Sequence, residues 1–403
     1  MKKEKIRLNL LSLVIISIFF IFLFTLSVLA TSILPGDFVG LMGDPTPDGK
    51  VDFNDLMVFA TAYGSETGDP NWNELCDICG YLGDPAPDGK VNFDDLMVFA
   101  TNYGKVCPVH NLTKDNYYNT IQAALDDAMS ENIIEVSTGT YYENIIFNNK
   151  NITVQSTNPL DPNIVDDTII DGGVSGSVVT FAGGDTSTLR GFTIQNGDAS
   201  YGGGIYVEDS YSTIENNTIR DNATVNWGGI YMNNSSPTIA DNTISNNTAN
   251  FGGGIFVDNN SSPDISGNTI TGNTVYNHGG GIYVYNSSPT IENNFINGNT
   301  ATGLTGYGGG IFVNNSSPTI AGNTISNNTA VIVGGGICVD NSDLLPSTDR
   351  PSGWGTGREN IPTGVPLVPV EGVKYTIAGN EFLGNEHGDP LDYTEGAHVY
   401  FSQ

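Results

Sequence analysis

Two stretches near the N-terminus place oxygen-bearing side chains at the spacing of a 12-residue calcium loop. Such a loop takes oxygen ligands at positions 1, 3, 5, 7, 9 and 12, with glycine at position 6. The first stretch supplies them from Asp44, Thr46, Asp48, the Lys50 carbonyl, Asp52 and Asp55. The second supplies them from Asp84, Asp88, the Lys90 carbonyl, Asn92 and Asp95. Because Ala86 leaves position 3 of the second loop empty, we expect two calcium sites of which the second is weaker.

Both loops are followed by the same residues, Asp-Leu-Met-Val-Phe-Ala-Thr, which favours a duplicated unit over two chance turns. This segment resembles a dockerin domain, in which each of two EF-hand-type loops leads into a helix. The resemblance implies a small α-helical domain over residues 43–107, with a cohesin-type scaffold protein as its partner. The sequence departs from the family in a cysteine-bearing insertion between the loops. It also carries Phe53-Asn54 where cohesin-binding dockerins commonly have small hydroxyl residues, which puts the cohesin partner in doubt.

Three cysteines and one histidine lie close together in this part of the sequence. Cys76 and Cys79 form a Cys-X-X-Cys pair, and Cys107 and His110 repeat the same spacing. Four such ligands can hold zinc in tetrahedral geometry. In an exported chain, disulfide pairing among the three thiols is the simpler alternative, and we expect it in preference to zinc. Cys338 lies far along the chain and is expected to be a lone thiol.

Residues 1–30 have the pattern of an export signal. The first seven residues are basic, and residues 8–30 are almost wholly apolar and end in a small-residue cleavage pattern. The apolar run is also long enough to span a bilayer, so both a cleaved signal and an uncleaved N-terminal anchor stay open. In either case the body of the chain, which follows a linker at 31–42, is predicted to be extracellular or on the cell surface.

The charge balance excludes one class of partner. The 403 residues include 44 Asp and Glu against 14 Lys and Arg, which gives a formal net charge of −30. Nucleic acids and anionic lipids bind to basic surfaces, so we expect neither as a partner of the body. Membrane contact is expected only through the N-terminal segment, if it is uncleaved. The same acidity suits calcium, although it also serves to keep a repetitive protein soluble.

A repeat in the second half of the chain predicts the fold. The phrase Gly-Gly-(Gly)-Ile recurs with isoleucines 25, 25, 27, 29 and 26 residues apart: Ile205, Ile230, Ile255, Ile282, Ile311 and Ile337. Short β-rich pieces, separated by Gly, Asn, Ser and Pro, fill each period. Such self-similarity indicates stacked units that cannot bury an apolar face alone. We predict a mostly β protein in which residues 108–403 form a parallel β-helix, with three-strand coils of about 25 residues.

Two asparagines recur in every period. The first column contains Asn217, Asn242, Asn268, Asn294, Asn323 and Asn380. The second follows five residues later and contains Asn222, Asn247, Asn273, Asn299, Asn328 and Asn385. At a bend, the amide of one coil can bond to the amide of the next, as in stacked cross-β structures. The columns are therefore predicted to be structural rather than catalytic.

The segments beside the repeat carry further signals. Asn119 or Thr120 can cap an amphipathic helix at 120–130, which is expected to cover the open edge of the first coil. Strands are then expected near 133–136, 143–147, 152–155, 168–170 and 178–181. An insertion loop at 341–370 interrupts the last coils and is expected to overhang one face.

Aromatic residues recur at two outward positions of the repeat. The candidates for glycan binding are Trp227 and the residues after the repeat isoleucine: Tyr206, Tyr231, Phe256, Tyr283 and Phe312. A second set, Tyr201, Trp227, Phe251, His278 and Tyr307, precedes the glycines. Stacked coils align these rings on one face, where sugar rings can pack and each ring adds little to the core. The alternative is that the rings stack on one another as cross-strand pairs.

The run Tyr118-Asn-Thr-Ile-Gln-Ala-Ala-Leu, with Gly139-Thr-Tyr-Tyr-Glu-Asn-Ile after it, resembles the entry segment of right-handed, pectate-lyase-like β-helix proteins. That group contains pectin-active enzymes, alginate epimerases and non-enzymatic surface proteins. The resemblance therefore implies a right-handed fold and no single activity. In the repeat we find no paired carboxylates, no Arg or Lys base beside an acidic cluster and no Ser-His-Asp pattern, so no catalytic residue is assigned.

The leading hypothesis is an exported, calcium-binding β-helix protein that acts as a polysaccharide-binding or adhesive module. One alternative is a carbohydrate-active enzyme, a lyase or hydrolase in polysaccharide catabolism, docked to a scaffold through the dockerin-like domain. The other alternative is a structural spacer.

Overall fold

The computed structural model describes residues 107–332, 334–340, 376–387 and 399–402, together with residues 56, 59, 60, 62–65 and 96. The chain divides into two compact units, Met1–Cys107 with Asn116–Asn119 and Pro108–Asp115 with Thr120–Gln403. The expected leader, linker, calcium loops and 341–370 insertion lie outside the described residues, as do Cys76 and Cys79. What the sequence predicts for them stays a prediction.

Only a small part of the first unit is described. Leu56, Phe59 and Ala62 are helical, and Phe59 and Ala62 are buried. The Tyr63 amide donates to the Phe59 carbonyl at 2.9 Å. The unit also contains strand β2 (Asn116–Tyr118). Among the helices that the described residues form, none combines the length and apolar character that a membrane crossing needs.

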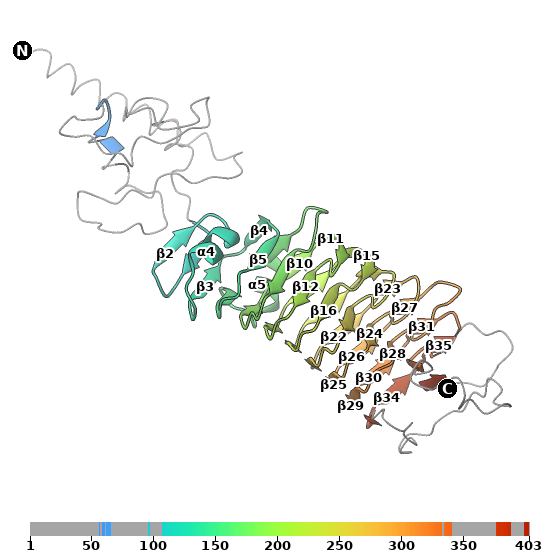
Figure 1. The fold of residues 1–403 in the computed structure, drawn as a ribbon. Helices are drawn as coiled ribbons and strands as arrows, with labels where there is room; N and C mark the ends of the chain where they lie inside the picture. Colours follow the sequence, from blue (N-terminus) through green and yellow to red (C-terminus); the bar gives the residue numbers. More distant parts are fainter. Residues whose placement is uncertain are drawn as a thin grey trace, which may run out of the picture. The chain divides into compact units, whose positions relative to one another are not determined.

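The second unit is a parallel β-solenoid with four sheets, which we number I to IV in the order in which one coil visits them (Figure 1). Sheet I contains β5 (Ile145–Phe147), β8 (Val179–Ala182), β12 (Ile205–Glu208), β16 (Ile230–Asn233), β20 (Ile255–Asp258), β24 (Ile282–Tyr285), β28 (Ile311–Asn314), β32 (Ile337–Asp340) and β36 (Val399–Ser402). Sheet II contains β1 (Val109–Asn111), β3 (Ile133–Val136), β6 (Thr153–Ser156), β9 (Thr188–Arg190), β13 (Thr213–Glu215), β17 (Thr238–Ala240), β21 (Asp264–Ser266), β25 (Thr290–Glu292), β29 (Thr319–Ala321) and β33 (Thr376–Ala378).

The other two sheets complete each coil. Sheet III contains β4 (Gly139–Tyr142), β7 (Thr168–Asp171), β10 (Thr193–Gln195), β14 (Thr218–Arg220), β18 (Thr243–Ser245), β22 (Thr269–Thr271), β26 (Phe295–Asn297), β30 (Thr324–Ser326) and β34 (Glu381–Leu383). Sheet IV contains β11 (Asp198–Tyr201), β15 (Ala223–Trp227), β19 (Thr248–Ala249), β23 (Thr274–Val275), β27 (Thr300–Ala301), β31 (Thr329–Ala330) and β35 (Glu386–His387).

The stacked strands confirm the predicted parallel β-helix, but the expectation of three strands per coil is wrong. Sheet IV adds a fourth, and in the central coils it is only two residues long, as in Thr248–Ala249. Its inward side chains form a small core of their own: Ala249, Val275, Ala301 and Ala330. Two residues are too few to show alternation, which is why the repeat pattern does not reveal this strand.

The main core consists of like residues stacked in register. In sheet I, Ile230 pairs with Ile205 on one side and Ile255 on the other. Sheets II and III contribute equivalent columns that include Ile239 and Ile244. These isoleucines are fully buried. Because successive strand residues point to opposite faces, one inward position per strand suffices to build a continuous core along the solenoid.

The predicted asparagine columns are confirmed as buried ladders. In the first column, the Asn268 amide nitrogen Nδ2 donates to Asn294 Oδ1 at 3.0 Å and to the Ile239 carbonyl at 2.8 Å. Its Oδ1 accepts from the backbone N–H and from Nδ2 of Asn242, at 2.9 and 3.0 Å. The second column repeats this pattern, as between Asn273 and Asn299. Each amide thus satisfies buried backbone groups at a bend where the strand ladder is interrupted.

A serine ladder, which we did not predict, forms at the turn between sheets I and II. The ladder contains Ser210, Ser235, Ser261, Ser287 and Ser316, and the backbone N–H of each of the first four donates to the hydroxyl of the next serine over 3.0–3.2 Å. All five are buried. The recurring phrase Asn-Ser-Ser-Pro is the sequence pattern from which this ladder could have been predicted.

The first coil begins with the expected helix. Helix α4 (Ile121–Asp127) has Thr120 as its N-cap, whose side chain accepts from the Ala123 N–H, and it ends three residues before the expected Ser130. The Glu143 carboxylate accepts from the first two backbone N–H groups of the helix at 2.9 Å. The apolar face of the helix packs against β1, β3 and β5.

The early strands match the sequence only in part. All five expected strands overlap observed ones, which are β3, β5, β6, β7 and β8. The strand expected at 143–147 is shorter and is preceded by a separate strand, β4. Helix α5 (Pro162–Asp167), capped by Asp161 with proline in its first turn, was not predicted.

Candidate functional site

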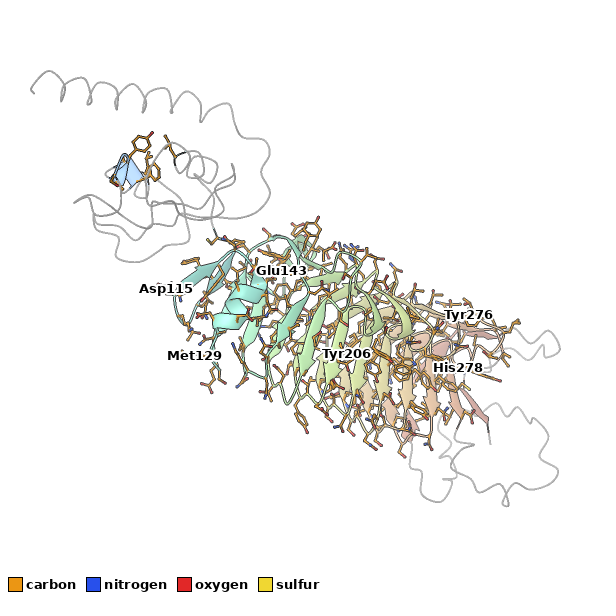
Figure 2. The ribbon with its side chains drawn as sticks, turned by 45° about the horizontal axis from the view of Figure 1, so that its top comes forward. Asp115, Met129, Glu143, Tyr206, Tyr276 and His278 are labelled. Carbon is orange, nitrogen blue, oxygen red and sulfur yellow. The ribbon has the colours of Figure 1, made fainter. Side chains whose placement is uncertain are left out.

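The outer face of sheet I carries a column of aromatic rings, with one cysteine, that we call the lower ladder. It consists of the residues after each repeat isoleucine: Tyr206, Tyr231, Phe256, Tyr283, Phe312 and Cys338. Neighbouring rings touch, with centroids 4.6 Å apart for Phe256 and Tyr283 and 5.0 Å apart for Tyr283 and Phe312. Figure 2 labels Tyr206 and His278 on this face.

A second column lies over the first, and we call it the upper ladder: Tyr201, Trp227, Phe251, His278 and Tyr307. Each of these residues directly precedes a glycine with positive φ, such as Gly228 at 66° and Gly279 at 69°. The sharp turn at that glycine brings the preceding side chain back over sheet I. A Cβ atom at Gly228 would lie 2.3 Å from the Ile230 carbonyl oxygen, so the turn requires glycine.

The upper ladder covers the lower one across coil boundaries. Trp227 lies 5.6 Å from Tyr231 in its own coil and 5.4 Å from Phe256 in the next, measured between ring centroids. His278 likewise lies 4.7 Å from Phe312 of the following coil. The two ladders together form a hydrophobic cluster outside the coil, separate from the isoleucine core.

This cover corrects the expectation that the candidate glycan-binding rings face water. Tyr231, Phe256, Tyr283 and Phe312 are only 5%, 3%, 7% and 2% exposed. These four rings are packed core, as in the alternative that the rings stack on one another. Tyr206 and Trp227 are partly exposed. Strand alternation predicts that a side chain leaves the coil, but it does not predict that a second layer then covers it.

Cys338 is the last of the repeat positions in the lower ladder, pairs in register with Tyr400 of β36, and is also buried. Burial, with the nearby Asp340 carboxylate as a smaller cause, raises the pKa of its thiol. A buried thiol with a raised pKa has little thiolate to react, so the position acts as a small apolar residue.

The strand ends of sheet I form a polar edge beside the ladders: Glu208, Asn233, Asp258, Tyr285, Asn314 and Asp340. The Tyr231 hydroxyl donates to Asp258 Oδ2 at 3.1 Å, and Asn233 Nδ2 donates to Glu208 Oε1 at 3.1 Å. Burial raises the pKa of the Asp258 carboxyl, although hydrogen bonds from Tyr231 and the Asn259 N–H oppose it. Burial, followed by the Glu208 carboxylate, raises the pKa of Tyr206 to about 12.

His278 is the member of the upper ladder that titrates near neutral pH in water. Burial lowers its pKa to about 4, although the Asp340 carboxylate acts in the opposite direction. Its Nδ1 is buried and has no hydrogen-bond partner. At neutral pH the ring is therefore uncharged and packs as an aromatic residue.

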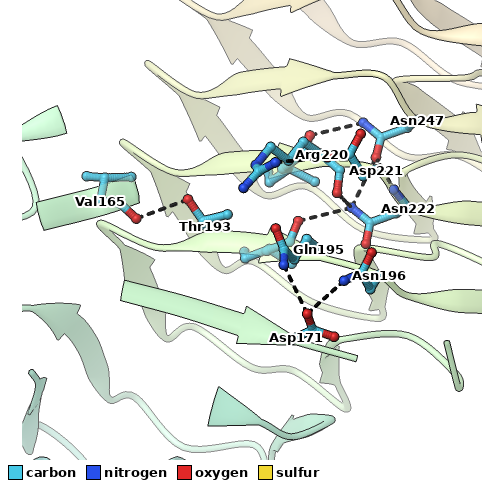
Figure 3. A network of polar contacts seen from close by, with 11 residues as sticks. Val165, Asp171, Thr193, Gln195, Asn196, Arg220, Asp221, Asn222 and Asn247 are labelled. Atoms are coloured by element: carbon cyan, nitrogen blue, oxygen red, sulfur yellow. Dashed lines mark hydrogen bonds and ion pairs between the residues drawn. The ribbon is translucent and has the colours of Figure 1, made fainter. Parts of the chain in front are cut away.

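A separate polar network at an early coil is structural (Figure 3). Asp171 Oδ2 accepts from Gln195 Nε2 at 2.9 Å and from Asn196 Nδ2 at 2.7 Å, while Oδ1 accepts from the Gly173 N–H. Burial acts to raise the pKa of Asp171, but these hydrogen bonds hold it below its ordinary value. These three hydrogen bonds hold the carboxylate in the turn that follows β7.

The predicted metal sites are described only in part. Cys107 Sγ lies 3.5 Å from Asn119 Oδ1, and His110 Nε2 lies 2.9 Å from Asp115 Oδ1. Within the described residues no three His, Cys, Asp or Glu side chains gather in a way that could hold a metal ion. The disulfide or zinc alternatives also involve Cys76 and Cys79, and the calcium loops lie wholly outside the described residues, so both remain predictions.

Comparison with known proteins identifies the repeat. The family model described as "Right handed beta helix region" matches residues 104–270 and 178–345. No curated protein and no solved structure matches the chain.

Proposed function

The chain belongs to the right-handed beta helix family, and from that premise we propose that it binds a polysaccharide along the upper ladder. The observation that carries the proposal is a row of partly exposed aromatic rings, one per coil, over five successive coils. Coils of a β-solenoid repeat at about 4.8 Å, so the row offers regularly spaced rings to an extended polymer. Rings of this kind, with a few polar groups beside them, are the usual lining of ligand sites.

The upper ladder replaces the lower one as the binding surface. Tyr201 is 39% exposed, and Trp227, Phe251, His278 and Tyr307 are each partly exposed. The polar edge, with Glu208 and Asp258, lies two residues further along the sheet I strands than the lower ladder that these rings cover, and it supplies acceptors for sugar hydroxyls.

The N-terminal part of the proposal rests on the sequence alone. We propose that the chain is exported and that residues 43–107 form a calcium-binding, dockerin-like domain. A cohesin-type scaffold is the partner that this resemblance implies. The solenoid would then act as a binding or adhesive module at the cell surface.

Leucine substitutions test the binding proposal without uncovering the lower ladder. Trp227→Leu, Phe251→Leu and Tyr307→Leu each remove an aromatic face while keeping apolar cover. Ile332 packs against the same cluster, so aliphatic cover is compatible with it. Each variant is expected to bind polysaccharide several-fold more weakly in affinity electrophoresis over a panel of soluble polysaccharides, with an almost unchanged melting temperature.

Phe295→Leu is the matched control. Phe295 is an outward ring on β26 of sheet III, 42% exposed and away from both ladders. It should leave binding unchanged. If the ladder variants also retain the polysaccharide as well as the parent chain does, the spacer alternative takes the lead.

One observation favours the enzyme alternative enough to test it. Asp258 is a half-buried carboxyl with a raised pKa, which is what a general acid for glycoside cleavage needs. Glu208 lies two coils away, at a strand spacing that amounts to about 10 Å along the solenoid. That backbone spacing lies just above the about 6.5–9.5 Å that separates the carboxyl groups of inverting glycosidases, so the raised pKa of Asp258 is the observation that favours this alternative. New reducing ends from a bound polysaccharide, absent with Asp258→Asn, would establish this activity.

A further inference from the structure

The charges on the face that carries the two ladders indicate which class of polysaccharide can bind there. In residues 191–340 the only Lys or Arg is Arg220. It lies on β14 of sheet III, where its guanidinium Nη1 is 3.0 Å from Asp221 Oδ2. Arg190, the nearest described arginine before it, lies on β9 of sheet II and pairs with Glu215. The described part of the ladder face therefore offers no cation to the carboxylate of a uronic acid.

The one histidine of the upper ladder adds no positive charge to this face at neutral pH. His278 has its pKa lowered to about 4 by burial and is uncharged at neutral pH. In contrast, Glu208 and Asp258 stand at the polar edge, half-buried beside the rings. The ion pairs found among the described residues include neither of them. Their hydrogen bonds come from neutral groups: the Asn233 amide and the Tyr206 hydroxyl for Glu208, and the Tyr231 hydroxyl and the Asn259 N–H for Asp258.

We infer that the face binds a polymer of amine-bearing sugars, whose ammonium groups pair with Glu208 and Asp258 while the sugar rings lie on the upper ladder. This inference rests on the proposed polysaccharide binding and names its substrate class. Two interactions would stabilise a bound ammonium group. It pairs with the carboxylates, and it is attracted to the aromatic faces, most strongly to that of tryptophan. A polyuronate would instead meet like charge on a protein whose formal net charge is −30.

Three oligosaccharides with one backbone test the inference on the full chain. The probes are β-1,4-linked pentamers of glucosamine, of N-acetylglucosamine and of glucuronic acid, at a pH where the amines are protonated. Titration calorimetry at about 0.15 M salt screens long-range attraction to the acidic protein as a whole. We expect the glucosamine pentamer to bind about tenfold more tightly than the acetylated one, and the uronate pentamer not to bind.

Charge-matched variants separate the site from the bulk charge. Glu208→Gln and Asp258→Asn should weaken glucosamine binding about fivefold each and weaken binding of the acetylated pentamer much less, because the amide oxygen still accepts from sugar hydroxyls while the charge is lost. Glu292→Gln and Asp264→Asn alter the net charge equally but lie on β25 and β21 of sheet II, and should have almost no effect. Melting temperatures establish that all four variants fold.

Each other outcome has a definite meaning. Equal binding of the amine and acetylated pentamers, or equal weakening by site and control variants, would overturn the amine inference and leave polysaccharide binding intact. Binding of the uronate pentamer would overturn it as well. If none of the three pentamers bound, and no polysaccharide of the panel did, the proposed function itself would fall.

Discussion

The indole of Trp227 rests on the ring of Phe256, which belongs to the next coil, with the two centroids 5.4 Å apart. Because Trp227 also lies against Tyr231 of its own coil at 5.6 Å, one upper side chain holds two successive coils together. The same relationship recurs where His278 reaches Phe312 of the following coil. The ladders therefore add a second apolar layer to the stacking of the coils, outside the isoleucine core.

Removing a lower ring should cost stability, although the ring points out of the coil. Phe256 is 3% exposed and packs against Tyr231, Trp227 and Tyr283. Phe256→Ala is expected to lower the free energy of unfolding by about 3 kcal/mol, because it leaves a cavity under the upper ladder. Urea denaturation measures the change. Phe295→Ala, at an exposed ring of sheet III, should cost less than about 1 kcal/mol. Similar small losses in both variants would mean that the upper ladder does not cover Phe256 in solution.

The asparagine ladder should be equally sensitive to a single gap. Asn268 is 1% exposed and connects Asn242 to Asn294 through its amide. Asn268→Ala leaves buried donors and acceptors in both neighbouring coils unpaired, at a cost of about 1–3 kcal/mol. Asn148→Ala removes an exposed amide and serves as the control. The comparison is made by thermal unfolding, and an unchanged melting temperature for Asn268→Ala would contradict the buried ladder.

His278 should make stability depend on pH. Its pKa is lowered from 6.5 to about 4 in the folded chain, so the unfolded chain binds more protons between these values. Stability therefore rises with pH across this window and is lost as the pH falls from 6.5 to about 4. After allowance for the partial exposure of the ring, we expect a loss of about 1–2 kcal/mol.

His278→Phe provides the test of that dependence. Phenylalanine already fills the equivalent position at Phe251, and the change also removes the buried, unpartnered Nδ1. The variant should be more stable than the parent at every pH, and its melting temperature should vary less between pH 6.5 and about 4. A parent and variant with the same pH profile would show that His278 is exposed in both states.

Calcium should order residues 43–107. The carboxylates of each loop repel one another until a divalent cation neutralises them, so calcium uptake and folding are expected to be coupled. Titration calorimetry of the full chain should resolve two sites. Asp44→Ala should abolish the tighter one, while Asp84→Ala should affect only the weaker one, since Ala86 already leaves it one oxygen short. No calcium uptake would end the dockerin-like interpretation.

The sequence predicts well the isoleucine and asparagine columns that the repeat aligns. The isoleucine registers and the columns that include Asn268 follow from the period, because stacked coils must align like residues. The serine ladder had the same kind of signal in the Asn-Ser-Ser-Pro phrase, and helix α5 had Asp161-Pro162, a capping residue before a proline.

The burial of Phe256 was not predictable in the same way. It depends on a second layer, and that layer depends on the positive φ of the glycines that turn the upper side chains inward. The presence of a glycine in a sequence does not fix its φ, because glycine adopts positive and negative φ about equally readily. Whether a side chain is covered thus depends on tertiary geometry, which the spacing of the repeat does not specify. For that reason the candidate binding surface is the upper ladder and not the predicted lower ladder.

The amide bonds of the first asparagine column have one further consequence. Asn268 and Asn294 are 26 residues apart, and Asn323 and Asn380 are 57 apart, yet the backbone-to-amide bond is 2.9 Å in both pairs. The ladder thus makes the register of a coil independent of the length of chain inserted within it. Such a gene can grow by duplicating a whole coil, or acquire new recognition loops by enlarging one turn, while the neighbouring coils keep every contact. The surface loops of this protein can therefore change in evolution while the fold of the solenoid is kept.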